Sequence, residues 1–158
     1  MNTFVRPEEF DPDRFLPPGI LENVISECRR APNGSSLVID GWPGSGKTPT
    51  SKWLAQRLCW PVIHLDEYNL NQRPEFDPKQ HSPGFDEEAM MDAVACRLKV
   101  GSVVVEGVCA GRICKPSVML HLGRWPGTRL IKSLTAFIAD YSPELHEGVQ
   151  STFWANFE

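Results

Sequence analysis

The chain has 158 residues, 41% of them hydrophobic, and a formal net charge of −4 at pH 7. That length suits one domain with its own core, and we expect a single domain over residues 1–158. The acidic balance argues against a nucleic-acid binder or a membrane-surface binder, because both need a basic face. We therefore expect neither nucleic acid nor membrane as a partner.

The cysteines also indicate a cell compartment. There are five, an odd number, and none forms a Cys-x-x-Cys pair. This usage favours reduced thiols in a cytoplasmic protein over a disulfide framework or a zinc site. No apolar run approaches the ~18 residues of a membrane-spanning helix, and the N-terminal segment is charged rather than signal-like. We expect a cytoplasmic protein.

The chain begins with a segment that predicts no regular structure. Residues 1–18 hold four prolines among charged residues, which predicts an irregular surface arm. From Ile20 to Arg30 apolar residues recur at helical spacing, so a helix is expected there. Leu37–Ile39 is typical of a short buried strand, and Thr50–Leu58 of a helix. The intervening turn carries the most specific pattern in the sequence.

The stretch from Gly41 to Thr48 has the spacing Gly, any four residues, Gly, Lys, Thr, which is typical of a P-loop around nucleotide phosphates. Glycines let the chain take φ > 0 and bring bare N–H groups against an anion. A helix that begins near Gly46 would direct its N-terminal N–H groups and dipole at the same phosphates. Lys47 would add a charge for the β- and γ-phosphates, and the Thr48 hydroxyl would ligate Mg²⁺.

The nucleotide contacts predicted from this pattern are contiguous: Gly41, Trp42, Pro43, Gly44, Ser45, Gly46, Lys47, Thr48 and Pro49. Pro49 falls in the first helical turn, where proline is tolerated. The alternative is an ordinary strand-turn-helix junction, but a plain turn has no use for a Lys-Thr pair after its last glycine.

A second apolar strand, Pro61–Leu65, leads directly into an acidic and aromatic run and then into a long loop. Residues 69–85 are polar and rich in proline, and loops of that length in compact domains are more often functional than structural. The candidate substrate contacts from the run and the loop are Asp66, Glu67, Tyr68, Arg73, Lys79 and His81. His64, inside the strand, is expected to be packed or hydrogen-bonded rather than a ligand.

The second half of the chain continues the alternation of helices and strands. Asp86 is expected to cap a helix that stops at Gly101. Val103–Val105 is typical of a central strand buried on both faces, and it delivers Glu106 at its carboxyl end. A fourth strand, Val118–Leu122, precedes a short lid at 123–130. A helix is expected from about 128 to 140, and a further short helix in the tail from 142 to 158.

This alternation predicts a three-layer α/β/α fold around a parallel sheet of four to five strands. Ligands of such sheets lie beyond the carboxyl ends of the strands, where the P-loop, Asp66 and Glu106 should meet. Asp66 would accept the proton of an attacking hydroxyl or hold Mg²⁺ through water. Glu106 would be relieved of a costly unpaired charge by metal contact. The alternatives are a solubilising role for Asp66 and an arginine or helix-terminus partner for Glu106.

The chain resembles the uridine kinase-like branch of small P-loop kinases. The similar blocks are Ile39–Thr48, Leu65–Tyr68 and Val104–Gly107, with Pro83–Asp86 as a further similar stretch. The resemblance covers residues 37–107. It implies that Asp66 is the general base and that Glu106 helps to organise Mg²⁺ or substrate. It also implies lid arginines that clamp the phosphates, with Arg124 and Arg129 as the candidates by position.

The C-terminal part departs from that family. The lid is short, and neither a fifth strand nor an adenine-contacting segment is evident after it. Two explanations stay open: a shortened chain, or contacts supplied by the second subunit of a homodimer.

We therefore expect a kinase that moves the γ-phosphoryl group of Mg·ATP to a hydroxyl of a small metabolite, with a nucleoside or nucleoside-like compound as the favoured acceptor. ATP and Mg²⁺ are the expected cofactors. Two alternatives stay open: a phosphotransferase acting on an antibiotic or a sugar nucleotide, and a nucleotide-binding regulatory module without catalysis.

Overall fold

A computed structural model of the chain describes residues 16, 18–41, 46–68, 86–107, 110–122 and 151–155. The helix expected at 128–140 and the lid expected at 123–130 lie outside the described residues. No helix in the described part of the chain is long and apolar enough to cross a bilayer.

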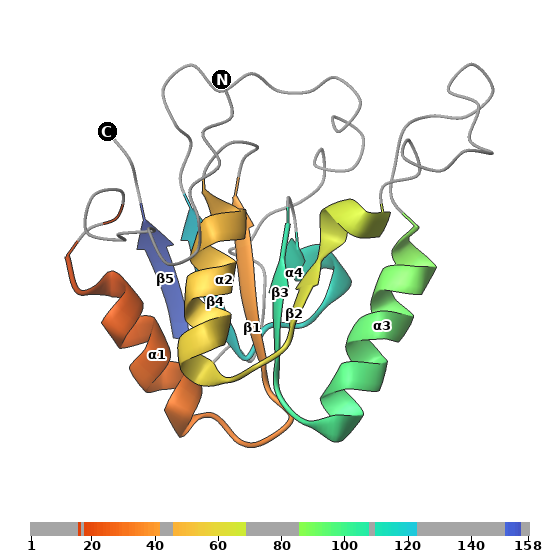
Figure 1. The fold of residues 1–158 in the computed structure, drawn as a ribbon, viewed down its shortest axis with the longest axis horizontal. Helices are drawn as coiled ribbons and strands as arrows, with labels where there is room; N and C mark the ends of the chain where they lie inside the picture. Colours follow the sequence, from red (N-terminus) through yellow and green to blue (C-terminus); the bar gives the residue numbers. More distant parts are fainter. Residues whose placement is uncertain are drawn as a thin grey trace, which may run out of the picture.

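The described elements follow the expected alternation of helices and strands (Figure 1). In chain order they are α1 (Ile20–Arg30), β1 (Ser36–Gly41), α2 (Lys47–Leu58), β2 (Val62–His64), the 3₁₀ helix η3 (Leu65–Tyr68), α3 (Glu87–Val100), β3 (Val103–Glu106), α4 (Ala110–Ile113), β4 (Val118–Leu122) and β5 (Ser151–Ala155).

The strands form one sheet in the order β2-β3-β1-β4-β5, and every neighbouring pair is parallel. All the arrowheads in Figure 1 therefore point to the same edge of the sheet. In the register, His64 lies opposite Glu106, and Asp40 lies opposite His121. Two pairs of polar side chains thus lie at the carboxyl ends of the strands, the edge where ligands of such sheets bind.

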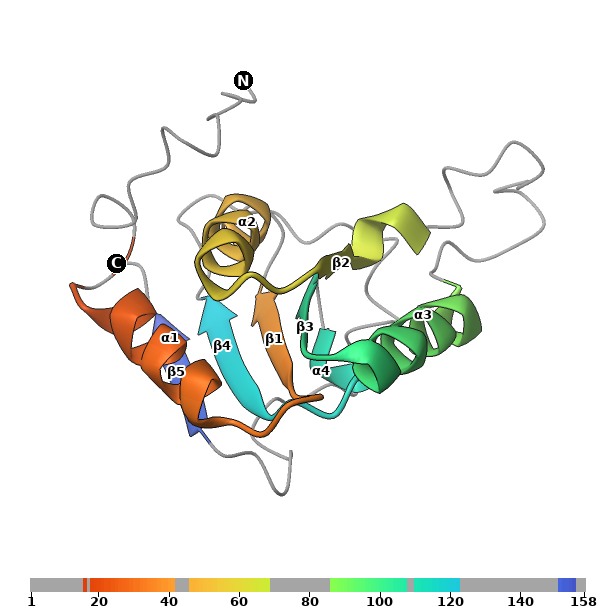
Figure 2. The same ribbon diagram turned by 60° about the horizontal axis from the view of Figure 1, so that its bottom comes forward.

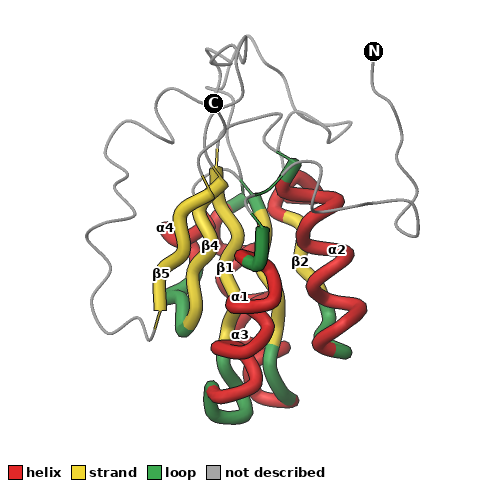
Figure 3. The backbone as a smooth tube through the Cα atoms, turned by 90° about the vertical axis from the view of Figure 1, so that its left-hand side faces the viewer, coloured by secondary structure: helices red, strands yellow, loops and turns green. Residues whose placement is uncertain are grey.

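Helices cover both faces of the sheet, and side chains that alternate along each strand divide the core in two. Leu37 and Ile39 pack with α1 and α2, whereas Val38 packs with α3 and α4. Figure 2 shows the helices around the sheet, and Figure 3 shows α2 and α4 on opposite sides of it. The predicted three-layer α/β/α architecture with a parallel sheet is confirmed.

The tail holds a strand that was not expected, Ser151–Ala155, and the rest of the tail, where a short helix was expected, lies outside the described residues. The strand pairs with β4 as a fifth strand, with Phe153 opposite Leu120. β-Branched and aromatic residues favour a strand, but a segment this short is stabilised by its partner strand rather than by its own periodicity.

The second strand also ends earlier than expected. It stops at His64, and Leu65 begins the 3₁₀ helix η3. Asp66 and Glu67 therefore do not alternate as they would on an extended chain, and both are exposed. α2 begins at Lys47, next to Gly46 as the P-loop pattern predicts, and Pro49 lies in its first turn.

Candidate active site

The described ends of the junction between β1 and α2 are two glycines with positive φ. Gly46 is the N-cap of α2 with φ 86° and Gly41 has φ 152°, conformations that residues with a Cβ rarely adopt. The Gly46 carbonyl accepts the Thr50 amide at 3.1 Å, which closes the first turn. The N-terminal amides of α2 therefore face the loop. The predicted contacts Trp42, Pro43, Gly44 and Ser45 lie outside the described residues.

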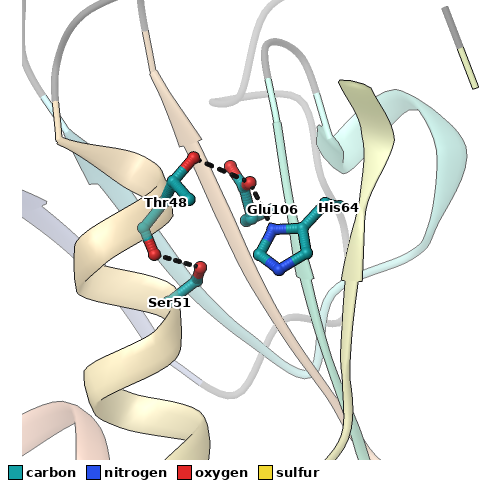
Figure 4. Close-up of polar contacts among 4 residues, drawn as sticks. All are labelled: Thr48, Ser51, His64 and Glu106. Atoms are coloured by element: carbon teal, nitrogen blue, oxygen red, sulfur yellow. Dashed lines mark hydrogen bonds and ion pairs between the residues drawn. The ribbon is translucent and has the colours of Figure 1, made fainter. Parts of the chain in front are cut away.

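Lys47 and Thr48 open the helix with different exposures. Lys47 is buried, with 8% of its surface exposed, whereas Thr48 is exposed. The Thr48 hydroxyl Oγ1 donates to Glu106 Oε1 at 3.1 Å (Figure 4). One turn later, the Ser51 hydroxyl donates to the Thr48 carbonyl at 2.8 Å. The contact between Thr48 and Glu106 joins the start of α2 to the end of β3.

Glu106 is a buried carboxylate with two hydrogen-bond partners. Only 2% of its surface is exposed. Its Oε1 atom also lies 2.6 Å from His64 Nδ1, on the neighbouring strand β2 (Figure 4). The partners in the described part of the chain are thus a hydroxyl from the first turn of α2 and an imidazole. Both act on Oε1, and Oε2 has no hydrogen-bond partner within the described residues.

His64 is hydrogen-bonded, as expected for a histidine within a strand. The hydrogen bond to Glu106 raises its pKa above the ordinary value, and the charges of Glu106 and Glu67 act in the same direction. Partial burial and the charge of Lys52 oppose this rise. The sequence did not show that His64 pairs with Glu106, because that contact depends on the register between two strands about 40 residues apart.

Asp66 lies in the same electrostatic environment as Lys47 and Glu106. Partial desolvation raises the pKa of Asp66 and the negative charge of Glu106 raises it further, while Lys47 and His64 lower it. The residue remains exposed, so solvent screens these interactions. The structure therefore brings the two acids and the lysine to one edge of the sheet. Glu67 lies exposed beside Asp66 on η3.

The position of η3 depends on a glycine directly after β3. A Cβ atom on Gly107 would lie 2.7 Å from the Cβ of Leu65, which is too close for real atoms. Leu65 is buried and immediately precedes Asp66. The Gly107 amide donates to the Ile39 carbonyl at 3.1 Å. The absence of a side chain thus lets the turn carrying Asp66 approach the strand that ends at Glu106.

Tyr68 has a structural position at the end of η3. It is half-buried against the core between the sheet and α3, and its carbonyl accepts the Asp86 amide at 2.9 Å. The other predicted substrate and phosphate contacts lie outside the described residues: Arg73, Lys79, His81, Arg124 and Arg129.

A second acid–histidine pair lies on the face of the sheet that α3 and α4 cover. Asp40, with 0% of its surface exposed, is hydrogen-bonded through Oδ1 to Nδ1 of His121 on β4. The pair lies directly before Gly41, where the P-loop begins. The signal in the sequence is one ionisable residue in each of two otherwise uncharged strands, and it did not enter the predictions above.

The described residues suit a magnesium site better than an all-protein metal cage. They contain no group of three or more His, Cys, Asp or Glu residues that would hold a metal ion. Mg²⁺ usually keeps several waters and is bound by one or two carboxylates together with phosphates. The Thr48 hydroxyl and the free Oε2 of buried Glu106 fit that chemistry, because a buried carboxylate oxygen without a partner is costly.

Comparisons with known proteins support the fold. No family model matches the sequence, and no curated protein matches it. Among solved structures, the chain is similar to one described as a possible uridine kinase from Bacillus stearothermophilus, with a TM-score of 0.51 and 16% identity. The match covers 84% of this chain and 98% of that chain. Likeness at this identity concerns the fold alone, and the chain shares with that structure an α/β fold around a parallel sheet.

Proposed function

We propose that the chain is a kinase that transfers the γ-phosphoryl group of ATP to a hydroxyl of a small metabolite. The observation that carries this proposal is the contact between the Thr48 hydroxyl and the buried Glu106 carboxylate, at the N-terminus of a helix that follows a P-loop pattern. A plain strand-turn-helix junction has no need for a buried carboxylate at that point. A phosphate and magnesium site does.

The residues at the helix start would bind the nucleotide. Lys47 and the backbone amides of α2 and its loop would neutralise charge on the β- and γ-phosphates. The Thr48 hydroxyl gives its only proton to Glu106, which leaves its oxygen lone pairs for a cation. Mg²⁺ would be held by Thr48 and by Glu106, directly or through water, and when bound it would neutralise developing charge on the phosphates.

Asp66 would be the general base. The acceptor oxygen attacks the γ-phosphorus, the bond to the β-phosphate oxygen breaks, ADP leaves, and the hydroxyl proton passes to the Asp66 carboxylate. A raised pKa makes that carboxylate a stronger base, which suits this role. In this scheme Arg124 or Arg129 would close over the transferring group, as the family resemblance implies.

For the acceptor we propose a nucleoside or nucleoside-like compound. The support is the fold similarity to a possible uridine kinase, together with the family resemblance of residues 37–107. An antibiotic or sugar nucleotide as acceptor is the alternative within the same chemistry. We further propose that the chain forms a homodimer in which the second subunit contributes adenine contacts, and sedimentation would detect such a dimer.

The test is substitution of the base. We expect Asp66→Asn to reduce phosphoryl transfer by about 10²–10⁴-fold while ATP affinity changes little. The matched control is Asp92→Asn, at an exposed position of α3. ATP consumption would be assayed against a panel of nucleosides, vitamins, sugars and antibiotics. If no compound is phosphorylated and Asp66→Asn changes nothing, the chain is a nucleotide-binding regulatory module instead.

A further inference from the structure

His64 and Glu106 form a cross-strand pair on the face of the sheet that α2 covers. They occupy the last positions of β2 and β3 and lie opposite each other in the parallel register. Val62 and Val104, two residues before His64 and Glu106 respectively, pack in the core beneath α1 and α2. The side chains of His64 and Glu106 therefore point to the same side of the sheet as Thr48 (Figure 4).

The hydrogen bonds on Glu106 are unequally divided between its two oxygens. Oε1 accepts from Thr48 at 3.1 Å and lies 2.6 Å from His64 Nδ1. Oε2 has no hydrogen-bond partner in the part of the chain that the structure describes. The Glu106 side chain is nevertheless almost fully buried, with only 3% of its surface exposed. A buried polar atom without a partner is costly, so this oxygen is suited to accept a group from beyond the described residues.

The two donors differ in how firmly they are held. Thr48 is exposed at the start of α2, and a hydroxyl turns freely to suit its partner. The His64 ring is planar, 18% exposed, and attached to a strand whose neighbour carries Glu106. A hydrogen bond from this ring fixes the rotation of the Glu106 carboxyl group, whether or not Thr48 turns toward a cation. Partners of this kind orient metal-binding carboxylates.

We propose that His64 is a positioning residue, which holds Glu106 Oε1 and so directs Oε2 toward the magnesium ion of the bound nucleotide. This inference rests on the proposed function for the binding of Mg·ATP, but not on the identity of the acceptor. It assigns to His64 a role in cation affinity rather than in the chemical step.

The experiment is a calorimetric titration of ATP into the full chain over a series of Mg²⁺ concentrations and in EDTA. Three variants are compared. His64→Leu removes the donor, and His64→Asn keeps an N–H donor near the position of Nδ1. Val62→Ala truncates a side chain on the same strand and face without touching Glu106, and so controls for loosening of β2.

We expect His64→Leu to raise the Mg²⁺ concentration for half-maximal ATP binding by about 10-fold or more, the size typical for loss of an outer-shell partner. The affinity of His64→Leu for ATP, both in EDTA and at saturating Mg²⁺, should stay near the wild-type value. In His64→Asn, the Mg²⁺ concentration for half-maximal ATP binding should return most of the way to the wild-type value. In Val62→Ala it should equal the wild-type value. If His64→Leu does not fold, His64→Gln, whose donor is one bond farther out, should show the same shift.

Three results would overturn the inference: an unchanged Mg²⁺ midpoint in His64→Leu, equal shifts in His64→Leu and Val62→Ala, or equal impairment in His64→Leu and His64→Asn. If the wild-type chain binds ATP independently of Mg²⁺, the inference and the metal site of the proposed function fall together. If Mg²⁺-dependent binding is found and only the transfer reaction is absent, the catalytic proposal fails and the role of His64 stands.

Discussion

Two buried carboxylates at the ends of central strands are each paired with a histidine from the next strand. Glu106 pairs with His64 on the face toward α2, and Asp40 pairs with His121 on the opposite face. A buried carboxylate is tolerated only when it is hydrogen-bonded, so each histidine makes it possible to keep an acid beside the P-loop. The two pairs differ in one respect: Glu106 keeps one oxygen for a ligand, whereas Asp40 is entirely enclosed.

Removing the enclosed carboxylate should destabilise the fold. We expect Asp40→Ala to lower the free energy of unfolding by about 3 kcal/mol, because the substitution removes a buried carboxylate that is hydrogen-bonded to His121. Asp40→Asn keeps an acceptor of the same shape and should cost less. Urea unfolding followed by circular dichroism gives both values. Asp92→Ala, at an exposed site, should change stability by less than about 0.5 kcal/mol. Equal losses at positions 40 and 92 would contradict this interpretation of the pair.

Gly107 should resist substitution because its missing side chain leaves room for Leu65. We expect Gly107→Ala to cost about 1–3 kcal/mol, since a Cβ at 2.7 Å from that of Leu65 forces η3 away from β3. The control is Gly101→Ala, where φ is 175° and the nearest atom would lie 3.8 Å away. Thermal unfolding measures both. A Gly107→Ala protein as stable as Gly101→Ala would show that the two segments are not held in contact.

At the scale of elements, helix ends determine where side chains are delivered. α2 begins at a left-handed Gly46 without a side-chain cap, so its terminal amides stay available to an anion. α3 begins differently: Asp86 caps it by accepting the Ala89 amide at 3.2 Å, with Glu87 and Glu88 in the first turn. The start of α3 is stabilised by its cap, whereas the proposed role of the start of α2 is to bind phosphate.

The cap of α3 provides a test at this scale. We expect Asp86→Ala to lower the free energy of unfolding by about 1 kcal/mol, the usual value of a lost N-cap. Asp86→Ser, which retains a capping oxygen, should recover most of that loss. Chemical denaturation of the three proteins checks the order. If Asp86→Ser is as unstable as Asp86→Ala, the capping contact is not the stabilising feature.

Most elements could be predicted from the sequence because their apolar patterns are local. The helix at Ile20–Arg30 and the strands at 103–106 and 118–122 follow directly from such patterns. β5 could not be predicted, because an edge strand of five residues depends on its partner β4, which lies far away in the chain. The 3₁₀ turn at Leu65–Tyr68 and the helix α4 are too short to show a period.

The site was only partly predictable for the same reason. The P-loop pattern and the acids at the strand ends are visible in the sequence, so Lys47, Thr48, Asp66 and Glu106 were expected near one another. The pairing of Glu106 with His64 follows from strand order and register, which local sequence does not carry. Gly107 belongs to a block that is similar to the kinase family, but the close approach of Leu65 to it follows only from the fold.

For the whole molecule, the two cores on either side of the sheet should protect some thiols and leave others reactive. Burial raises the pKa of Cys28 to about 12 and also raises that of Cys114, so at neutral pH both remain protonated. Cys59 and Cys96 are exposed. We expect a maleimide to modify Cys59 and Cys96 rapidly in the native protein and Cys28 and Cys114 only after unfolding, since the thiolate is the reactive form. Peptide mass spectrometry locates the adducts. Rapid native labelling of Cys28 would mean that α1 does not pack on the sheet.

The central claim is that the edge of the sheet at Gly46–Thr48 and Glu106 binds a nucleoside triphosphate with magnesium. Calorimetric titration of ATP and GTP, each with and without Mg²⁺, tests it most directly in the wild type, Thr48→Val and Ser51→Ala. Ser51 is a matched control, because its hydroxyl lies one turn along the same helix and bonds to the Thr48 carbonyl rather than to Glu106. We predict saturable binding that Mg²⁺ strengthens in the wild type and in Ser51→Ala, and loss of that strengthening in Thr48→Val. No binding of either nucleotide with Mg²⁺, or equal Mg²⁺ dependence in all three proteins, would contradict the account.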